Sequence, residues 1–390
     1  MSKPQPTGSL SHHQQKQQAK RQARPKRVKQ GGGDNLRRYR AVLAALRQAY
    51  PVPPRGNLAR HLNTLAWLIS GIVGSRRTNY PEIAQKCPDG NRPESRVKHF
   101  SRWVNNEQID TETYFAPYVV SLLVGLAQQP LVLAIDGSEV GRDCLALLVS
   151  VIYRHRALPL GWVVVKGSKG HFPEESHLAL VTRVAALLPP GAEVIFLGDG
   201  EFDGVSLQAA LAAYGWAYVC RTAHNAVLST EDEEFRFKEL GLRPGQIIGI
   251  PDVAFTEKGY GPVQVVAWWA KRYKEPIYLV TNLDLAEEAC FWYKKRFGIE
   301  TFFSDQKSRG FHLHKSHLTN PERLATLMMA ACLAYIWMVY LGVYARRTGW
   351  NTIIHRSDRC DLSLFQLGLR LLEHFLNEGL SIPVAFYISV

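Results

Sequence analysis

Two aspartates each follow a short apolar run and precede a glycine. Asp136 follows Leu131–Ile135, and Asp199 follows Val194–Gly198 in the same way. Because runs of this length and composition are typical of buried strands, we expect both carboxylates to emerge where a strand ends, and on adjacent strands they would face one crevice. Aspartate before glycine is also a common turn pattern, so neither aspartate is diagnostic by itself.

A third acid stands in a four-residue pattern. At about 100° per residue, Tyr293, Arg296, Glu300 and Lys307 fall within an arc of roughly 60° on a helix. An acid beside two cations and an aromatic ring is unusual for a solvated helix face, although a salt-bridged surface helix is the alternative. The pattern fits a metal-binding Glu300, phosphate-binding cations and a tyrosine that lines the path of a nucleic-acid strand.

Three converging carboxylates suit phosphodiester chemistry. Cleavage needs an activated nucleophile and neutralisation of charge at the phosphate, and two Mg²⁺ or Mn²⁺ ions supply both. Such ions take hard oxygen ligands and few of them from protein. We therefore predict that Asp136, Asp199 and Glu300 are catalytic and hold two divalent ions. Neighbouring acids are alternative ligands or support the ligands: Glu139, Glu201 and Asp203.

The composition indicates a folded protein with a polyanionic partner. The 390 residues are 46% hydrophobic and 11% aromatic, enough for a large core and two or three domains, and the net charge is +13. Clustered Lys and Arg attract phosphate, so nucleic acid is the leading partner. Much of this charge lies in residues 1–35, which we predict to be a basic disordered tail, either a solvated leader or an arm that tracks DNA.

The elements expected after the tail alternate in type. Residues 36–129 have helical periodicity and include two helices around a turn, the second one basic, which is typical of a DNA-binding domain but also of an ordinary helical bundle. Residues 130–222 predict the order β-β-β-α-β-α-β, which suggests an RNase H-like mixed sheet with flanking helices. Residues 223–283 are predicted to be a β-rich insertion. Residues 284–347 would complete the catalytic core and carry Glu300, and 348–390 would form a C-terminal helical region.

The cysteine spacing and the hydropathy of the sequence indicate a protein of the reducing cytosol. The six cysteines include no CxxC pair, so neither a zinc ribbon nor a disulfide framework is indicated, and the N-terminus lacks the apolar segment of a signal peptide. Leu324–Ala345 is long and apolar enough to cross a membrane, but we predict a buried core helix and no membrane partner. Three nearby histidines have no fourth ligand and do not predict zinc: His312, His314 and His317.

These residues resemble the DDE transposases of the insertion-sequence-four type. The resemblance rests on Asp136, on Asp199 with the following Gly200-Glu201-Phe202, and on the Tyr-Arg-Glu-Lys pattern. Three further motifs are similar to the same family: Arg309-Gly310-Phe311, His317-Leu318-Thr319 and Pro321-Glu322-Arg323-Leu324. The resemblance extends from about residue 130 to 375, and the helical N-terminal region matches only loosely.

The resemblance implies an RNase H-like catalytic domain with its insertion between the second aspartate and the glutamate. It further implies metal ligands at Asp136, Asp199 and Glu300, and contacts to transposon-end DNA from the other three pattern residues, Tyr293, Arg296 and Lys307. The implied activity is DNA cleavage and strand transfer at the ends of an insertion sequence, with a possible hairpin intermediate. The implied partners are double-stranded end and target DNA and a second copy of the chain, in a bacterial cytoplasm near the nucleoid.

Other readings of the same residues stay open. A structure-specific nuclease or resolvase on the same fold would cut DNA without joining it, and a domesticated DNA-binding protein would do neither. The tryptophan pair Trp268 and Trp269 is a candidate for stacking on a flipped base, although two tryptophans in a strand are more often part of the core.

Overall fold

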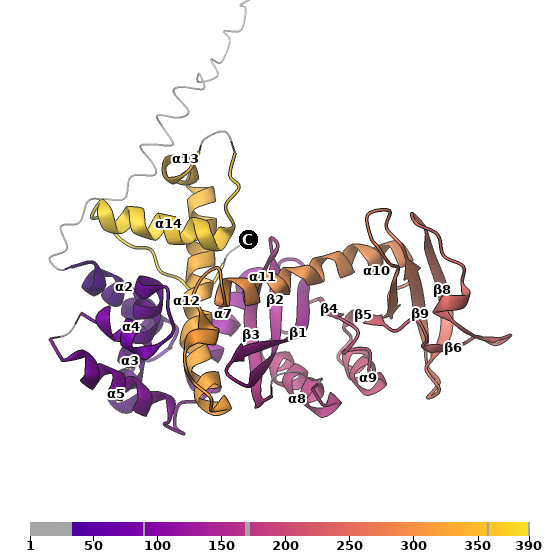
Figure 1. Cartoon of the computed structure of the whole chain (residues 1–390), viewed down its shortest axis with the longest axis horizontal. Coiled ribbons are helices and arrows are strands. Elements are labelled where there is room, and N and C mark those ends of the chain that lie inside the picture. Colours follow the sequence, from indigo (N-terminus) through magenta and orange to yellow (C-terminus); the bar gives the residue numbers. More distant parts are fainter. Residues whose placement is uncertain (1–32, 89, 168–171, 357–358, 389–390) are drawn as a thin grey trace, which may run out of the picture.

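A computed structural model of the protein describes residues 33–88, 90–167, 172–356 and 359–388. Almost all of the predicted basic tail therefore lies outside the described residues. The described chain runs from a group of helices, through one long sheet, and back to helices that pack beside the first group (Figure 1).

The N-terminal helices form where apolar residues recur three and four positions apart. In α3, for example, Leu62, Leu65, Ile69 and Ile72 all have no exposed surface. The last stretch of this helical region is broken at Phe115 into two shorter helices. The bounds are α2 (Asp34–Gln48), α3 (Gly56–Ser75), α4 (Tyr80–Gln85), α5 (Pro93–Val104), α6 (Thr111–Tyr114) and α7 (Ala116–Leu126).

A ten-stranded sheet crosses the molecule in the order β3-β2-β1-β4-β5-β10-β9-β8-β6-β7. Its first half contains β1 (Leu131–Gly141), β2 (Cys144–Tyr153), β3 (Arg156–Lys166), β4 (Val194–Gly198) and β5 (Ala217–Thr222). Its second half contains β6 (Val227–Ser229), β7 (Glu234–Arg236), β8 (Ile247–Phe255), β9 (Tyr260–Trp268) and β10 (Ile277–Thr281).

The first half of the sheet has RNase H-like topology. β1, β2 and β3 are antiparallel neighbours, whereas β4 runs parallel to β1 and β5 runs parallel to β4. The helices α8 (Glu174–Ala185) and α9 (Val205–Ala213) connect β3 to β4 and β4 to β5. The predicted order and the mixed α/β fold class with flanking helices are therefore confirmed.

The segment 223–283 continues this same sheet. β10 pairs antiparallel with β5, and β9 then pairs with β10. An open strand edge exposes unpaired backbone groups, and β10 satisfies those of β5. The strands β6 to β9 consequently extend the sheet away from the N-terminal helices, as Figure 1 shows.

After the sheet, helices return across it and build the core beside the first helices. Their bounds are α10 (Ala286–Tyr293), the 3₁₀ turn η2 (Lys294–Phe297), α11 (Gly298–Gln306), the 3₁₀ turn η3 (Leu313–Lys315), α12 (Pro321–Arg347), α13 (Asn351–Ile354) and α14 (Leu364–Asn377). α12 is long and apolar enough to cross a membrane, but 83% of its most apolar window is buried inside the protein. It packs on α14, α3 and β3, as expected for a core helix.

Candidate active site

Asp136 and Asp199 lie side by side because β1 and β4 are adjacent parallel strands. The last pair in their ladder is Ala134 with Leu197, and each aspartate follows that pair by two residues. One detail of the prediction is wrong: β1 does not end before Asp136 but continues to Gly141. The reason is that β2 goes on pairing with β1 after β4 has ended, with Asp136 opposite Leu148.

The third acid comes from a helical segment that crosses the sheet. The four pattern residues share one helical face only approximately. The turn η2 separates α10 from α11, and Lys307 lies just past the end of α11. A 3₁₀ turn has three residues per turn and so rotates the side chains that follow it. The long side chains of the pattern still reach the two aspartates.

The Arg296 guanidinium lies between the three carboxylates. Its Nη1 is 3.6 Å from Asp136 Oδ2 and 3.8 Å from Asp199 Oδ2, and its Nη2 is 3.5 Å from Glu300 Oε1. Acids from β1, from the loop after β4 and from α11 therefore approach one group, although they are far apart in the sequence. The structure thus brings together Asp136, Asp199, Arg296 and Glu300.

The contacts around Arg296 neutralise charge without filling its hydrogen-bonding capacity. Arg296 is only 7% exposed, and its Nε and Nη1 atoms have no hydrogen-bond partner. Burial and the neighbouring Asp199 carboxylate raise the pKa of Asp136 to about 6, against the lowering effect of Arg296. Two carboxylates close together in a partly buried site hold excess negative charge, which a further cation would stabilise.

The donor set matches what a hard divalent cation takes, but its present arrangement is not a finished metal site. All three donors are carboxylates, the ligand type that Mg²⁺ and Mn²⁺ prefer. Among the residues that the structure describes, no three acidic, histidine or cysteine side chains form a ready metal site. Arg296 occupies the space between the acids, so a bound ion would need this guanidinium to move aside.

The other two pattern residues contact Arg296 and β1, respectively. Tyr293 is 1% exposed, and its ring centroid is 5.9 Å from Arg296 Cζ, so it packs against the arginine. Burial raises the pKa of the Tyr293 hydroxyl, which stays protonated. Lys307 Nζ donates a 2.7 Å hydrogen bond to Ser138 Oγ on β1, and burial lowers the pKa of its ammonium.

Comparison with known proteins identifies the family. A profile of the transposase DDE domain family matches residues 129–337, which is more than half of the chain. The chain belongs to this family. Membership supports a transposase role, and DDE transposases generally use divalent metal ions.

Curated protein sequences and solved structures show less similarity to the chain than the family profile does. No curated protein sequence matches the chain. Among solved structures, the chain is similar to piggyBac transposase, determined by cryo-EM as a synaptic complex with hairpin DNA. The two chains are 12% identical, the match covers 92% of this chain and 84% of that one, and the TM-score is 0.44.

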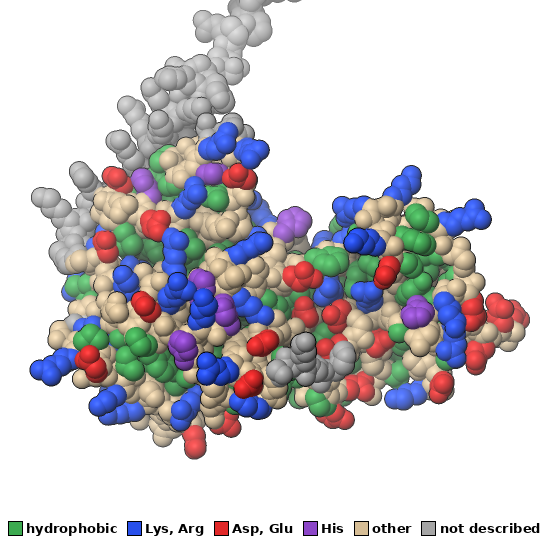
Figure 2. All heavy atoms as spheres, in the orientation of Figure 1, with side chains coloured by type: hydrophobic (Ala, Val, Ile, Leu, Met, Phe, Trp, Pro, Cys, Tyr) green, Lys and Arg blue, Asp and Glu red, His purple; other side chains and the backbone are tan. Residues whose placement is uncertain are grey.

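Several basic side chains outside the four-residue pattern lie around His314, close to Lys307. Burial and the positive charges of Lys315, Lys307 and Arg77 lower the pKa of His314. Thr78, next to Arg77, donates a 3.2 Å hydrogen bond to the backbone oxygen of His312, so the loop after α3 touches this segment. Lys, Arg and His side chains gather on the face over α12 and the N-terminal helices (Figure 2). Only the fold brings Arg77 and Thr78 to this histidine segment, and no local signal in the sequence marks that contact.

The alternative acids in this DDE domain have other contacts. Glu201 Oε1 is 3.6 Å from His177 Nε2, and Asp203 accepts a 2.6 Å hydrogen bond from Thr222. Both therefore engage neighbouring elements, and neither is among the carboxylates that contact Arg296. Glu139 lies nearer, since its charge acts on Lys307.

The remaining candidates lie outside the carboxylate cluster. Trp268 is 4% exposed and packs edge-to-face against Tyr273, as a core residue would. The indole Nε1 of Trp269 donates a hydrogen bond to the Tyr273 backbone oxygen. The ring centroids of His312 and His314 are 5.9 Å apart, but neither belongs to a metal-binding group within the described chain. All six cysteines lie in described segments and are free thiols.

Proposed function

We propose that the protein is a transposase that cleaves DNA strands at the ends of an insertion sequence and transfers them to new sites. The observation that carries this proposal is the approach of Asp136, Asp199 and Glu300 to a single point on a DDE transposase domain. In the proposed site these three carboxylates hold two divalent ions, Mg²⁺ or Mn²⁺. The ions would supply charge neutralisation at the phosphate and activation of the attacking hydroxyl.

The protein's own side chains would bind the DNA phosphates and position one another. Arg296 neutralises the acids in the free protein, and it would turn to a DNA phosphate once metal and DNA arrive. Tyr293 packs against Arg296 and would hold it in position, while Lys307 would bind a second phosphate beside β1. These roles agree with the end-DNA contacts that the Tyr-Arg-Glu-Lys pattern implies.

The reaction would proceed in two displacements at phosphorus. Water attacks the phosphodiester at the element end, and the bond to the 3′ oxygen breaks to leave a free 3′-hydroxyl. That hydroxyl then attacks a phosphodiester on the opposite strand, which gives a hairpin, or on target DNA, which gives strand transfer. No protein–DNA covalent bond is needed. Synapsis of two ends would require two copies of the chain.

The direct test is incubation of purified protein and Mg²⁺ with the DNA that flanks its own gene. We expect cleavage at inverted repeats and joining of the new 3′ ends to a target, both visible by sequencing the products. Cutting without joining would instead identify a nuclease or resolvase. Binding without either reaction would identify a DNA-binding protein that has lost catalysis.

A further inference from the structure

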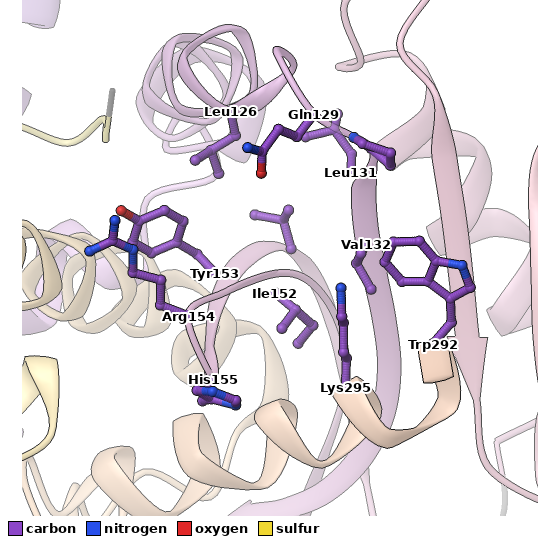
Figure 3. Close-up of a pocket in the computed structure, with 12 residues that line it drawn as sticks. Leu126, Gln129, Leu131, Val132, Ile152, Tyr153, Arg154, His155, Trp292 and Lys295 are labelled. Carbon is purple, nitrogen blue, oxygen red and sulfur yellow. The ribbon is translucent and has the colours of Figure 1, made fainter. Parts of the chain in front are cut away.

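A second site lies at the N-terminal end of β1, where Leu131 and Val132 line a cavity. A cavity of about 360 Å³ opens there, within the size range of ligand pockets. Its floor is apolar, formed by residues of β1 and β2 such as Val132 and Ile152 (Figure 3). Its polar lining carries three groups that are or can become cations, Arg154, His155 and Lys295, and no acid.

The cations are accompanied by aromatic rings. Lys295 rises from the helical segment into the cavity beside Trp292, with its Nζ 3.9 Å from the Trp292 ring centroid (Figure 3). On the far side, Arg154 Cζ lies 5.4 Å from the Tyr153 ring centroid. A cavity with rings for stacking and ammonium and guanidinium groups for phosphate matches the two halves of a nucleotide.

The turn that carries Arg154 and His155 has an energetically unfavourable backbone conformation. Tyr153 pairs with Arg156, so β2 and β3 are joined by a two-residue turn made of Arg154 and His155. Both have positive φ, 44° and 63°. Such turns strongly favour Asn-Gly, because most side chains are strained there. Two large basic side chains kept in strained positions beside a cavity suggest a binding role.

The cavity is fixed to the helical segment that bears Glu300. Arg156 forms a 2.8 Å ion pair with Asp305 of α11, and Thr301 lies 3.4 Å from the His155 backbone oxygen that it bonds. Along β1, Val132 precedes Asp136 by four residues, or about 13 Å. That distance corresponds to about four steps of stacked DNA strand.

From these observations we infer that the cavity binds one unpaired nucleotide of a DNA strand that continues to the carboxylates, with its base against Trp292 and its phosphate on Lys295 and Arg154. This inference rests on the proposed function for its choice of DNA. Lys295 would exchange its contact with the indole ring for the phosphate. The site would hold the strand at a second point during cleavage.

The decisive variant replaces the turn residues by those that the turn prefers. Arg154→Asn with His155→Gly should raise the melting temperature, because the strain is removed, yet weaken binding of fluorescein-labelled oligothymidine roughly tenfold in EDTA at pH 8. Arg346→Asn, which removes one exposed cation at the end of α12, controls for general charge. A double variant that is more stable and binds the oligonucleotide as wild type does would overturn the inference.

Two further variants separate stacking from packing. Trp292→Ala should weaken oligothymidine binding roughly tenfold, and Trp292→Phe should restore most of it because a ring remains. Lys295→Gln should weaken binding, whereas Lys294→Gln should not, since Lys294 lies over Trp268 outside the cavity. Equal losses for the two lysine variants, or no rescue by phenylalanine, would count against the site.

Location can be read directly by photocrosslinking. Oligonucleotides that carry 5-iododeoxyuridine at successive positions should crosslink to the peptide with Trp292 or Tyr153 at one position, about four nucleotides from the cleaved bond. Crosslinks that avoid both peptides would reject the site, as would tight binding of dTMP with no contribution from the rest of a strand. Binding and crosslinking need no metal, and only the four-nucleotide spacing depends on cleavage. A protein that binds through this cavity but never cleaves DNA would therefore disprove only the proposed function.

Discussion

Asp136 on β1 and Asp199, the first residue after β4, each lie two residues beyond the last pair of the β1–β4 ladder. Their closeness is therefore set mainly by the pairing of these two parallel strands. Glu300 completes the group from α11, and Arg296 separates the three acids. This arrangement leads to three predictions besides those on the second cavity, and a fourth concerns the packing of α12 on α14.

Glu300→Gln should lower DNA cleavage roughly a thousandfold while end binding changes little, because the acid serves the chemistry and is largely exposed to solvent. Gel analysis of cleavage and anisotropy of end binding would be measured on the same preparation. The matched control is Glu287→Gln, an exposed acid in the first turn of α10, which should cleave normally. Persisting hydrolysis in the Glu300 variant would remove this residue from the site.

Arg296→Ala should weaken end binding and reduce the slope of log affinity against log salt by about 1, the amount expected for one lost phosphate contact. Arg183→Ala, on α8, removes the same charge away from the carboxylates and should leave the slope unchanged. If both variants have the wild-type slope, Arg296 does not bind a phosphate and only neutralises the acids.

The pKa of Asp136, raised to about 6 from 3.8, predicts a pH-dependent stability in metal-free protein. Because the folded state binds this proton more tightly than the unfolded state does, protonated Asp136 stabilises the fold. This contribution to the free energy of unfolding is fully present below about pH 4 and is lost as the pH rises to about 6. Asp136→Asn should lack that loss, which is about 3 kcal/mol. Urea unfolding in EDTA at several pH values would show it. Parallel pH profiles for wild type and variant would contradict the account.

The crossing of α12 and α14 depends on two glycines. A Cβ at Gly368 would collide with the backbone oxygen of Met338, and one at Gly342 with the backbone of Leu364. Glycine to alanine usually stabilises a helix by about 1 kcal/mol, but here Gly368→Ala and Gly342→Ala should each destabilise the protein by about 3 kcal/mol. Gly90→Ala, with no atom within 4 Å of its Cβ position, should be neutral in the same denaturation assay.

The sequence was sufficient where a local pattern carries the information. Apolar runs predicted β1 to β5 with the helices between them, and the same runs located Asp136 and Asp199 next to buried strands. The four-residue helical pattern predicted that Arg296 and Glu300 share a face. That pattern survives η2 because arginine and lysine are long enough to compensate for the changed rotation.

Longer-range relationships could not be predicted in this way. Nothing near residue 277 shows that β10 pairs with β5, and nothing near Arg77 shows that its charge reaches His314. The continuation of β1 past Asp136 depends on β2, a partner that apolar periodicity does not identify. The position of Arg296 between the acids is likewise a tertiary contact, visible only once three distant segments have folded together.

The measurement that tests the central claim most directly is cleavage of the polypeptide by Fe²⁺ bound in place of Mg²⁺, with ascorbate and peroxide, in the presence of end DNA. Radicals produced at the ion cut the backbone nearby, so mass spectrometry reports which segments surround it. We predict cuts near residues 136, 199 and 300 together, all suppressed by excess Mg²⁺ and by Asp136→Asn. Cuts near only one of these segments, or cuts that Asp136→Asn leaves intact, would contradict a shared metal site.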